Sequence, residues 1–196
     1  MVRRSTQPDL FASEPAGPEG FAYVRDLIDA AGESALEREI AGLPFREFEF
    51  RGYLGKRRVV SFGWRYDFSR QGLRPADEIP AFLLPLREKA AALAGLDPAA
   101  FVHVLVTEYG PGAAIGWHRD RPEFGDVVGV SLMSPCLFRF RRRVGQAWER
   151  ASFLAEPRSA YLLRGPARTE WEHSIPGVDA LRYSVTFRTL RGKLDR

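Results

Sequence analysis

The chain has 196 residues, of which 45% are hydrophobic and 28% are charged, as in ordinary globular proteins. It has no apolar run near the roughly 20 residues that a membrane span needs, and its single cysteine excludes an internal disulfide, so we expect a cytoplasmic protein. The net charge of +4, carried mostly by arginine, favours a polyanionic partner such as nucleic acid, although codon usage alone can also enrich arginine.

The first 20 residues are rich in proline and glycine and show little periodicity. We therefore expect a mobile tail over residues 1–20 and a single domain over residues 21–196. Phe21–Val24 is typical of a short strand. Apolar residues at helical spacing predict one helix over residues 33–43 and a second over residues 80–94.

Residues 51–75 combine cations with aromatic rings. Arg57 and Arg58 precede a predicted strand, and Trp64 and Tyr66 then alternate with charged residues, which places both rings on one face. Such a surface suits base stacking together with phosphate contacts. A strand that packs its rings into the core is the competing interpretation.

A polar loop is predicted over residues 71–78, and further strands over residues 102–109, 125–131 and 136–140, joined by Gly/Pro turns. Many short strands after two helices predict a mainly β protein with flanking helices (α+β), built as a sandwich or barrel. The arginines at 141–143 form the densest positive charge, either a binding rim or a solvated strand end.

Three residues have the types and spacing of a metal site. His118 and Asp120 lie two residues apart, so on an extended strand their side chains leave the same face, and His173 follows further along the chain. Two imidazoles and one carboxylate form the facial site of non-haem Fe(II) oxygenases, but a zinc hydrolase can use the same ligands. His103 lies outside this spacing and is interpreted as structural.

Residues 182–188 alternate between polar and apolar side chains. Arg182, Ser184, Thr186 and Arg188 share the polar face, which an edge strand would expose to water. The alternative is a site for an anion, because arginine presents a rigid fork that matches a carboxylate. Two arginines behind a candidate metal site favour an iron enzyme with a dicarboxylate co-substrate.

Together these motifs resemble the AlkB family of Fe(II)- and 2-oxoglutarate-dependent dioxygenases. The resemblance rests on Y-G-P-G-A-x-I-x-W-H-x-D from Tyr109, on the distant E-H-x-I around His173 and on the closing R-Y-S-x-T-F-R from Arg182. It covers about residues 101–188. It implies a double-stranded β-helix core of the jelly-roll, cupin-like kind.

The resemblance also implies the cofactors and their contacts. Fe(II) would be held by His118, Asp120 and His173, with 2-oxoglutarate as co-substrate and O2 as oxidant. Arg182 would hold the distal carboxylate of 2-oxoglutarate and Arg188 would lie near Asp120. The full set of implied 2-oxoglutarate contacts is Tyr109, Thr107, Arg182, Ser184 and Arg188.

The implied activity is oxidative dealkylation of N-alkylated bases in single-stranded DNA or RNA by a monomer, with release of succinate, CO2 and an aldehyde. Residues 51–75 would form the substrate-recognition lid, in which Trp64 and Tyr66 contact the base and Arg57 and Arg58 contact phosphates. The best-known repair enzymes carry an acidic base contact where this chain has Pro122. A dioxygenase acting on a protein or small molecule, or a metal-binding module without turnover, are the alternatives.

Overall fold

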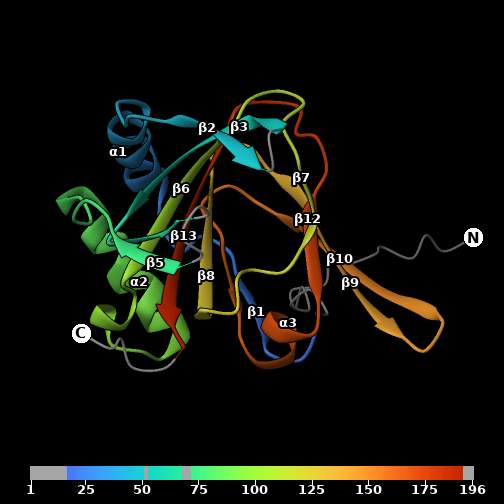
Figure 1. Cartoon of the computed structure of the whole chain (residues 1–196). Helices are drawn as coiled ribbons and strands as arrows, with labels where there is room; N and C mark the ends of the chain where they lie inside the picture. Colours follow the sequence, from blue (N-terminus) through green and yellow to red (C-terminus); the bar gives the residue numbers. More distant parts are fainter. Residues whose placement is uncertain (1–16, 51–52, 68–71, 192–196) are drawn as a thin grey trace, which may run out of the picture.

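The computed structural model describes residues 17–50, 53–67 and 72–191 (Figure 1). Most of the predicted tail, residues 1–16, lies outside the described residues. Two antiparallel sheets form the centre of the structure. Helices α1 (Ala30–Ala41) and α2 (Leu84–Ala94) lie on the side of the larger sheet that faces away from the smaller one (Figure 1).

The larger sheet has seven strands, and every neighbouring pair is antiparallel. Its order is β1 (Phe21–Val24), β11 (Ala160–Leu163), β8 (Phe124–Leu132), β13 (Arg182–Leu190), β6 (His103–Tyr109), β3 (Tyr53–Phe62) and β2 (Arg46–Phe50). The arginine-bearing strand β13 is therefore central, and the edge-strand interpretation is wrong. All residues from Arg182 to Arg188 are buried.

The smaller sheet has four strands, in the order β10 (Ala147–Ala155), β9 (Cys136–Val144), β12 (Glu172–Ile175) and β7 (Ile115–His118). Two sheets of this kind with few helices confirm the expected mainly β, jelly-roll fold. A separate hairpin pairs β4 (Trp64–Asp67) with β5 (Gly72–Pro75). The short helices are α3 (Gly165–Thr169), η1 (Ala81–Leu83) and η2 (Pro98–Ala100).

Each of the two long helices has a recognisable cap at one end. Asp29 accepts a hydrogen bond from the backbone nitrogen of Gly32 at 2.7 Å, so α1 begins three residues before the predicted start. Leu36 and Ile40, one turn apart, bury the inner face of α1. Gly95, with a φ of 64°, ends α2 in the left-handed conformation that glycine adopts without strain.

Two hydrophobic clusters hold the layers together. One lies between the helices and the larger sheet and contains the apolar face of β13, namely Tyr183, Val185 and Phe187. The other lies between the two sheets and is rich in aromatic rings, and Cys136 is buried in it. The polar face of β13 thus points into the space between the sheets, because side chains alternate along a strand.

Three elements differ from the sequence-based expectations. Strand β5 lies inside the predicted polar loop, and neither β10 nor α3 was predicted. The sequence does not predict β10 because its outward face carries the apolar Trp148 and Leu154 as well as Arg150. Polar and apolar residues therefore do not alternate regularly along this strand. In the described part of the chain, no helix is both long and apolar enough to cross a membrane.

Candidate active site

The three candidate metal ligands come together at the end of the smaller sheet. His118 is the last residue of β7, and its Cα pairs with that of His173 on β12. The two imidazole rings lie 4.2 Å apart between centroids. Asp120 follows β7 in a loop, not on the extended strand that we expected, and its Oδ2 lies 4.0 Å from Nε2 of His173.

Asp120 is held in its charged form by an arginine. Nη2 and Nε of Arg188 lie 2.8 and 3.2 Å from Oδ1 of Asp120. Burial opposes the charged carboxylate, but the Arg188 guanidinium, with help from the neighbouring imidazoles, outweighs it and lowers the pKa of Asp120. The expected position of Arg188 beside Asp120 is therefore what the structure shows.

Both imidazoles are held in the neutral form that a metal requires. Burial, followed by the neighbouring His118, lowers the pKa of His173 to about 3. Burial also lowers the pKa of His118. Nδ1 of His118 lies 2.9 Å from the carbonyl oxygen of Gly116, a contact in which the ring nitrogen must donate. Nε2 of His118 is then the nitrogen with the free lone pair.

His103 lies beside Arg188 and supports it, a role that its position in the sequence did not indicate. It pairs with Arg188 across β6 and β13, and its Nδ1 lies 3.4 Å from Nη1 of Arg188. An arginine can only donate, so Nδ1 of His103 must accept and the ring must be neutral. Burial, then the charge of Arg188, keeps the pKa of His103 well below its usual value. His103 thus orients Arg188 toward Asp120.

Arg168 on α3 organises the loop that carries Asp120, and sequence reasoning missed it. Its side chain is buried, and it donates to backbone carbonyl oxygens of Asp120 at 3.2 Å, Phe124 at 2.9 Å and Gly125 at 3.1 Å, and to that of Arg121. One guanidinium thus satisfies four acceptors within residues 120–125, which are the loop after β7 and the start of β8. The only sequence signal was Gly165-Pro166, which indicates a helix start but says nothing about this arginine.

Arg182 is fully buried and only partly paired. Its Nε donates to Oγ of Ser131 at 3.2 Å, and its guanidinium lies over the ring of Tyr109, 5.0 Å from the centroid. Within the described residues, Nη1 and Nη2 have no hydrogen-bond partner. Leaving such donors unpaired costs about 1–3 kcal/mol or more, and an anion that accepts from both would remove this cost.

The other expected 2-oxoglutarate contacts lie on the same sheet face. Tyr109 pairs with Arg182 across β6 and β13, and Thr107 pairs with Ser184. Ser131 on β8, which sequence reasoning missed, pairs with Ser184 from the other side. Arg182 and Arg188 are six residues apart, about 20 Å along a strand. They therefore mark opposite ends of the space between the sheets.

Arg57 and Arg58 lie on opposite faces of β3. Arg57 pairs with Tyr109, and a hydrogen bond with Tyr109 opposes the lowering of its pKa by burial. Arg58 makes a bidentate ion pair with Glu108, through Nε at 2.7 Å and Nη2 at 2.8 Å. The structure thus brings Arg57 to the Arg182 pocket and separates it from Arg58.

The candidate lid is partly described. Gly63 has a φ of 76°, and a Cβ there would lie 2.0 Å from the carbonyl oxygen of Val102, so the turn into β4 requires glycine. Trp64, half-buried, begins β4 and pairs with Pro75 of β5. The side chain of Tyr66 lies outside the described residues, as do residues 51–52 and 68–71.

Residues 45–188 match the family model described as the 2OG-Fe(II) oxygenase superfamily. The chain belongs to this superfamily. Its similarity to the "Alkylated DNA repair protein ALKBH8 homolog" of Arabidopsis thaliana is 28% identity over 164 residues, covering 70% of this chain and 47% of that protein. The chain thus spans about half the length of that relative.

A second curated relative agrees with the superfamily assignment, and two solved structures show the same fold. "Probable RNA/DNA demethylase ALKBH6" of Danio rerio is 29% identical over 189 residues, covering 91% of this chain and 78% of that protein. "The structure of OsALKBH1" has a TM-score of 0.67 at 16% identity, covering 89% of this chain and all of that one. A 2OG-Fe(II) oxygenase family oxidoreductase from Burkholderia pseudomallei has a TM-score of 0.61 at 14% identity, covering 89% and 86%. The predicted AlkB resemblance and fold are confirmed.

The 2OG-Fe(II) oxygenases are dioxygenases that use Fe(II), 2-oxoglutarate and O2, so the expected cofactors are confirmed. The residues of this chain fit them. The unpaired Nη atoms of Arg182 fit a carboxylate, and His118, Asp120 and His173 are donors of the type that Fe(II) accepts. No cluster in the described part of the chain already has metal-binding geometry, so these three side chains would have to adjust to close around an ion.

Proposed function

We propose that this dioxygenase removes N-alkyl groups oxidatively from bases in single-stranded DNA or RNA. The main support for a 2-oxoglutarate-dependent reaction is the buried Arg182. Its two unpaired Nη atoms would be satisfied by a carboxylate bound between the sheets. The names of the two curated relatives, an alkylated DNA repair protein homologue and a probable RNA/DNA demethylase, support nucleic acid as the substrate. The positive charge of the chain suits such a polyanion.

His118, Asp120 and His173 would hold Fe(II), while Arg182 and Tyr109 would hold the distal carboxylate of 2-oxoglutarate. When bound, Fe(II) with 2-oxoglutarate and O2 supplies the oxidation, in which one oxygen atom enters succinate and the other hydroxylates the alkyl carbon, with loss of CO2. The hydroxylated group then leaves as an aldehyde, and the base regains its proton. The neutral imidazoles and the ionised Asp120 need no proton release before they bind the metal.

The remaining polar residues of the pocket have supporting roles. Thr107 and Ser184 would donate hydrogen bonds to 2-oxoglutarate, where the repair enzymes use asparagine. Arg188 would fix Asp120, and Arg57, through Tyr109, would belong to the 2-oxoglutarate end rather than to the phosphate contacts.

The substrate would be bound by the candidate lid, residues 51–75. The lid would belong to a single domain that covers residues 21–196. Trp64 and Tyr66 would stack on the extruded base, and stacking on an aromatic ring contributes about 1–3 kcal/mol per base. A single strand is favoured because extrusion from a duplex costs a few kcal/mol. The single, buried Cys136 is consistent with the cytoplasmic location that we expect.

The test is succinate release from 2-oxoglutarate in three parallel reactions, with methylated single-stranded DNA, with methylated RNA and without substrate. We expect one of the two nucleic acids to raise succinate release well above the substrate-free rate. The same low rate in all three reactions would overturn the proposed substrate class.

A second candidate is the same chemistry on a protein or small molecule. The observation that favours it is Pro122, exposed in the loop after Asp120, where the repair enzymes carry an acidic contact to the base. Stimulation of succinate release by a peptide or metabolite fraction, with none by either nucleic acid, is the result that this alternative predicts.

A further inference from the structure

The outward face of the smaller sheet carries a ladder of alternating arginine and tryptophan side chains, Arg139, Trp117, Arg141, Trp148 and Arg143. The guanidinium of Arg139 lies 5.0 Å and that of Arg141 4.5 Å from the Trp117 ring centroid. Arg141 and Arg143 lie 4.4 and 5.5 Å from the Trp148 ring. We call these five residues the arginine–tryptophan face.

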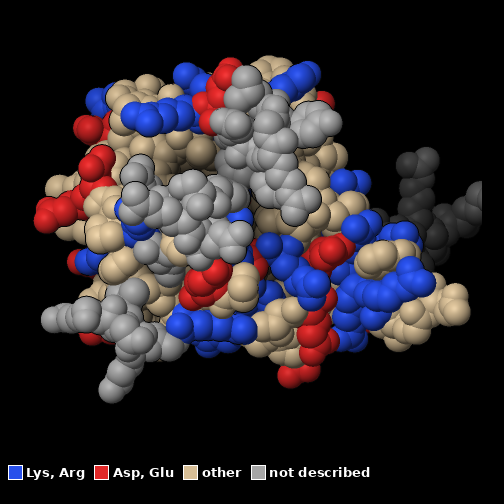
Figure 2. All heavy atoms as spheres, in the orientation of Figure 1, with Lys and Arg blue, Asp and Glu red and all other residues tan. Residues whose placement is uncertain are grey.

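The face lies directly behind the candidate metal site. Trp117 precedes His118 on β7 and Glu172 precedes His173 on β12, and neighbouring residues of a strand point to opposite sides. Figure 2 shows the positive side chains gathered around the β9–β10 hairpin, with acidic ones beside them. Anything bound there would run along the back of the strands that carry the two histidines.

Each arginine of the face is anchored through Nε alone. Arg139 donates to Oγ of Ser174 at 3.1 Å, Arg141 to Oε2 of Glu172 at 2.6 Å, and Arg143 to the carbonyl oxygen of Gly145 at 3.0 Å. Among the hydrogen bonds of the described residues, none uses an Nη atom of these three arginines. Their outer edges therefore present paired N–H donors, and the stacked rings fix the direction of those donors.

Arg142 does not belong to this face, which corrects the view of residues 141–143 as one positive patch. It forms ion pairs with Glu149 at 2.7 Å and Glu170 at 2.9 Å, and its guanidinium lies 4.9 Å from the Trp171 ring centroid. These two carboxylates neutralise its charge. On the outward face of β9, Arg141 shares its charge with Glu172, so the positive charge without an acidic partner is on Arg139 and Arg143.

The spacing of the three arginines suits a chain of phosphates. Alternate residues of a strand are about 7 Å apart, which is close to the separation of successive phosphates in an extended single strand. A guanidinium edge matches a phosphate with two parallel hydrogen bonds. The tryptophan faces are covered by the arginines, so they orient the cations instead of stacking on bases.

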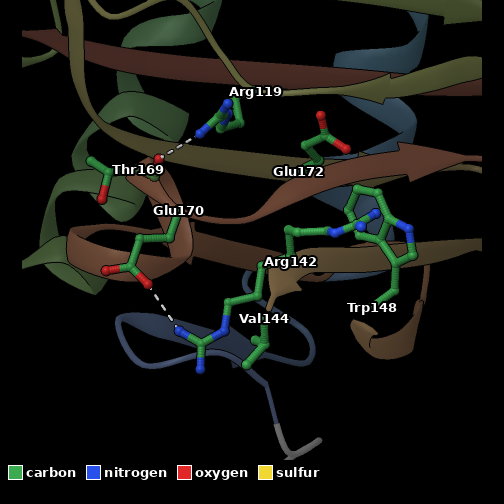
Figure 3. A pocket seen from close by; sticks show the side chains of 8 residues that line it. Arg119, Arg142, Val144, Trp148, Thr169, Glu170 and Glu172 are labelled. Carbon is green, nitrogen blue, oxygen red and sulfur yellow. Dashed lines mark hydrogen bonds and ion pairs between the residues drawn. The ribbon is translucent and has the colours of Figure 1, made fainter. Parts of the chain in front are cut away.

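A groove lies beside the arginine–tryptophan face. It has a volume of about 660 Å³. Its lining includes Arg143, Trp148 and Glu172 from the region of the face, together with Arg119 and the paired Arg142 and Glu170. Figure 3 shows Arg119 directed at the carbonyl oxygen of Thr169, to which its Nη1 donates at 3.3 Å. Arg119 is the chain neighbour of both His118 and Asp120, but neither of these candidate ligands is among the residues that line the groove.

We propose that the arginine–tryptophan face binds the phosphate backbone of the single strand that flanks the alkylated nucleotide, with one phosphate at each of Arg139, Arg141 and Arg143. The inference rests on the proposed function, because it assumes that the substrate is a nucleic acid. It makes the face a second binding site, separate from the lid, that holds a long substrate without reading its sequence.

The test compares two double variants with the same loss of charge. Arg139→Gln with Arg143→Gln removes two cations of the face and leaves the Arg141–Glu172 ion pair in place. The control, Arg38→Gln with Lys89→Gln, removes two exposed cations from helices α1 and α2 on the other side of the larger sheet. Unchanged substrate-free 2-oxoglutarate decarboxylation in both variants verifies that the fold is intact.

The measurement is the affinity for an unmodified single-stranded oligonucleotide, by fluorescence polarisation, over a range of salt concentrations. Each lost phosphate contact lowers the salt slope for a single strand by about 0.7, so the face variant should lose about 1.4 and the control should match the wild type. We also expect at least about ten-fold weaker binding by the face variant. Equal slopes in all three proteins overturn the inference.

Two further results separate this inference from the proposed function. The face variant should have a raised KM for a long alkylated oligonucleotide and an unchanged KM for an alkylated trinucleotide, which is too short to reach the face. Wild-type protein that binds the oligonucleotide through the face but turns over no alkylated nucleic acid overturns the proposed function alone. Displacement of the oligonucleotide by polyglutamate at equal charge concentration would assign the face to acidic proteins and overturn the inference.

Discussion

Arg188 holds the carboxylate of Asp120 through two donors on one oxygen, with Nη2 2.8 Å and Nε 3.2 Å from Oδ1. Oδ2 of the same carboxylate faces Nε2 of His173 at 4.0 Å. The arginine therefore fixes which oxygen of Asp120 is available on the side of the histidines. Nη1 of the same guanidinium contacts Nδ1 of His103 at 3.4 Å. The position of Arg188, and with it the charged state of Asp120, therefore depends on both partners.

The first prediction concerns metal affinity. Arg188→Lys keeps the charge but cannot place two donors on Oδ1 of Asp120, and loss of such an outer contact typically costs ten- to a hundred-fold in metal affinity. The measurement is an anaerobic Fe(II) titration. Arg164→Lys is a matched control, since Arg164 also places two donors, at 3.0 and 2.7 Å, on one oxygen of Asp126. Equal affinities for both variants would contradict the role of Arg188.

The second prediction concerns 2-oxoglutarate. Arg182→Lys removes the planar fork from the pocket, so the concentration of 2-oxoglutarate needed for half-maximal decarboxylation should rise about ten- to a hundred-fold, as expected for about 1.5–3 kcal/mol. Thermal unfolding with and without 2-oxoglutarate provides a second readout, because the ligand should stabilise the wild type more than the variant. Fe(II) affinity should not change. A normal requirement for 2-oxoglutarate would place its distal carboxylate elsewhere.

The third prediction concerns the loop after Asp120. Arg168→Lys cannot reach all four carbonyl groups, so the variant should lose about 3 kcal/mol of stability, equivalent to two hydrogen bonds to a charged group. Amide hydrogen exchange should rise over residues 121–125 and remain unchanged in β13. Unchanged exchange in the loop would show that Arg168 does not position it.

The motifs indicated which residues would lie together because these residues occur in short contiguous patterns. The H-x-D pair and the alternating strand from Arg182 to Arg188 could be read from spacing, and the structure brings them together. The contacts of Arg168 could not be predicted, because its partners are backbone carbonyl oxygens more than 40 residues away, and every residue has such an oxygen.

Sheet register and strand order determine the contacts of the residues whose positions could not be predicted from the sequence. Arg57 and Arg58 are adjacent, so a strand must send them to opposite faces, yet only the pairing of β3 with β6 decides which one meets Tyr109. Ser131 is a partner of Arg182 only because β8 lies beside β13 in the sheet. Local sequence patterns do not predict the order of strands in a sheet. The exposed strand β10 lacked a clear apolar face and was missed for that reason.

The fourth prediction concerns pH. His173 has a pKa of about 3 in the folded protein and His103 a lowered one, against about 6.5 in the unfolded chain. The unfolded chain therefore binds more protons below pH 6.5, so the free energy of unfolding of the metal-free protein should fall as the pH decreases from 6.5 to 4.5. Each such histidine contributes up to about 1.4 kcal/mol per pH unit.

The measurement for this prediction is urea unfolding at several pH values. His103→Gln removes one of the titrating groups, so its free energy of unfolding should decrease less steeply with acid than that of the wild type. Parallel curves for the two proteins would mean that His103 keeps an ordinary pKa in the folded state.

The fifth prediction concerns the candidate lid. Trp64→Ala should abolish or greatly reduce turnover of methylated nucleic acid, because the ring is expected to stack on the base, but should retain substrate-free decarboxylation of 2-oxoglutarate. Both activities are measured on the same preparation, so the second serves as the control for folding. A parallel loss of both would make Trp64 a core residue.

The most direct test of the central claim is the mass of a singly methylated single-stranded oligonucleotide after incubation with the protein, Fe(II), 2-oxoglutarate and O2. The proposed function predicts that the oligonucleotide loses one methylene unit, with one formaldehyde and one succinate formed per methyl group removed. The reaction should need 2-oxoglutarate and should be absent in His173→Ala. An unchanged oligonucleotide mass, for both DNA and RNA and with 2-oxoglutarate decarboxylation intact, would contradict the account.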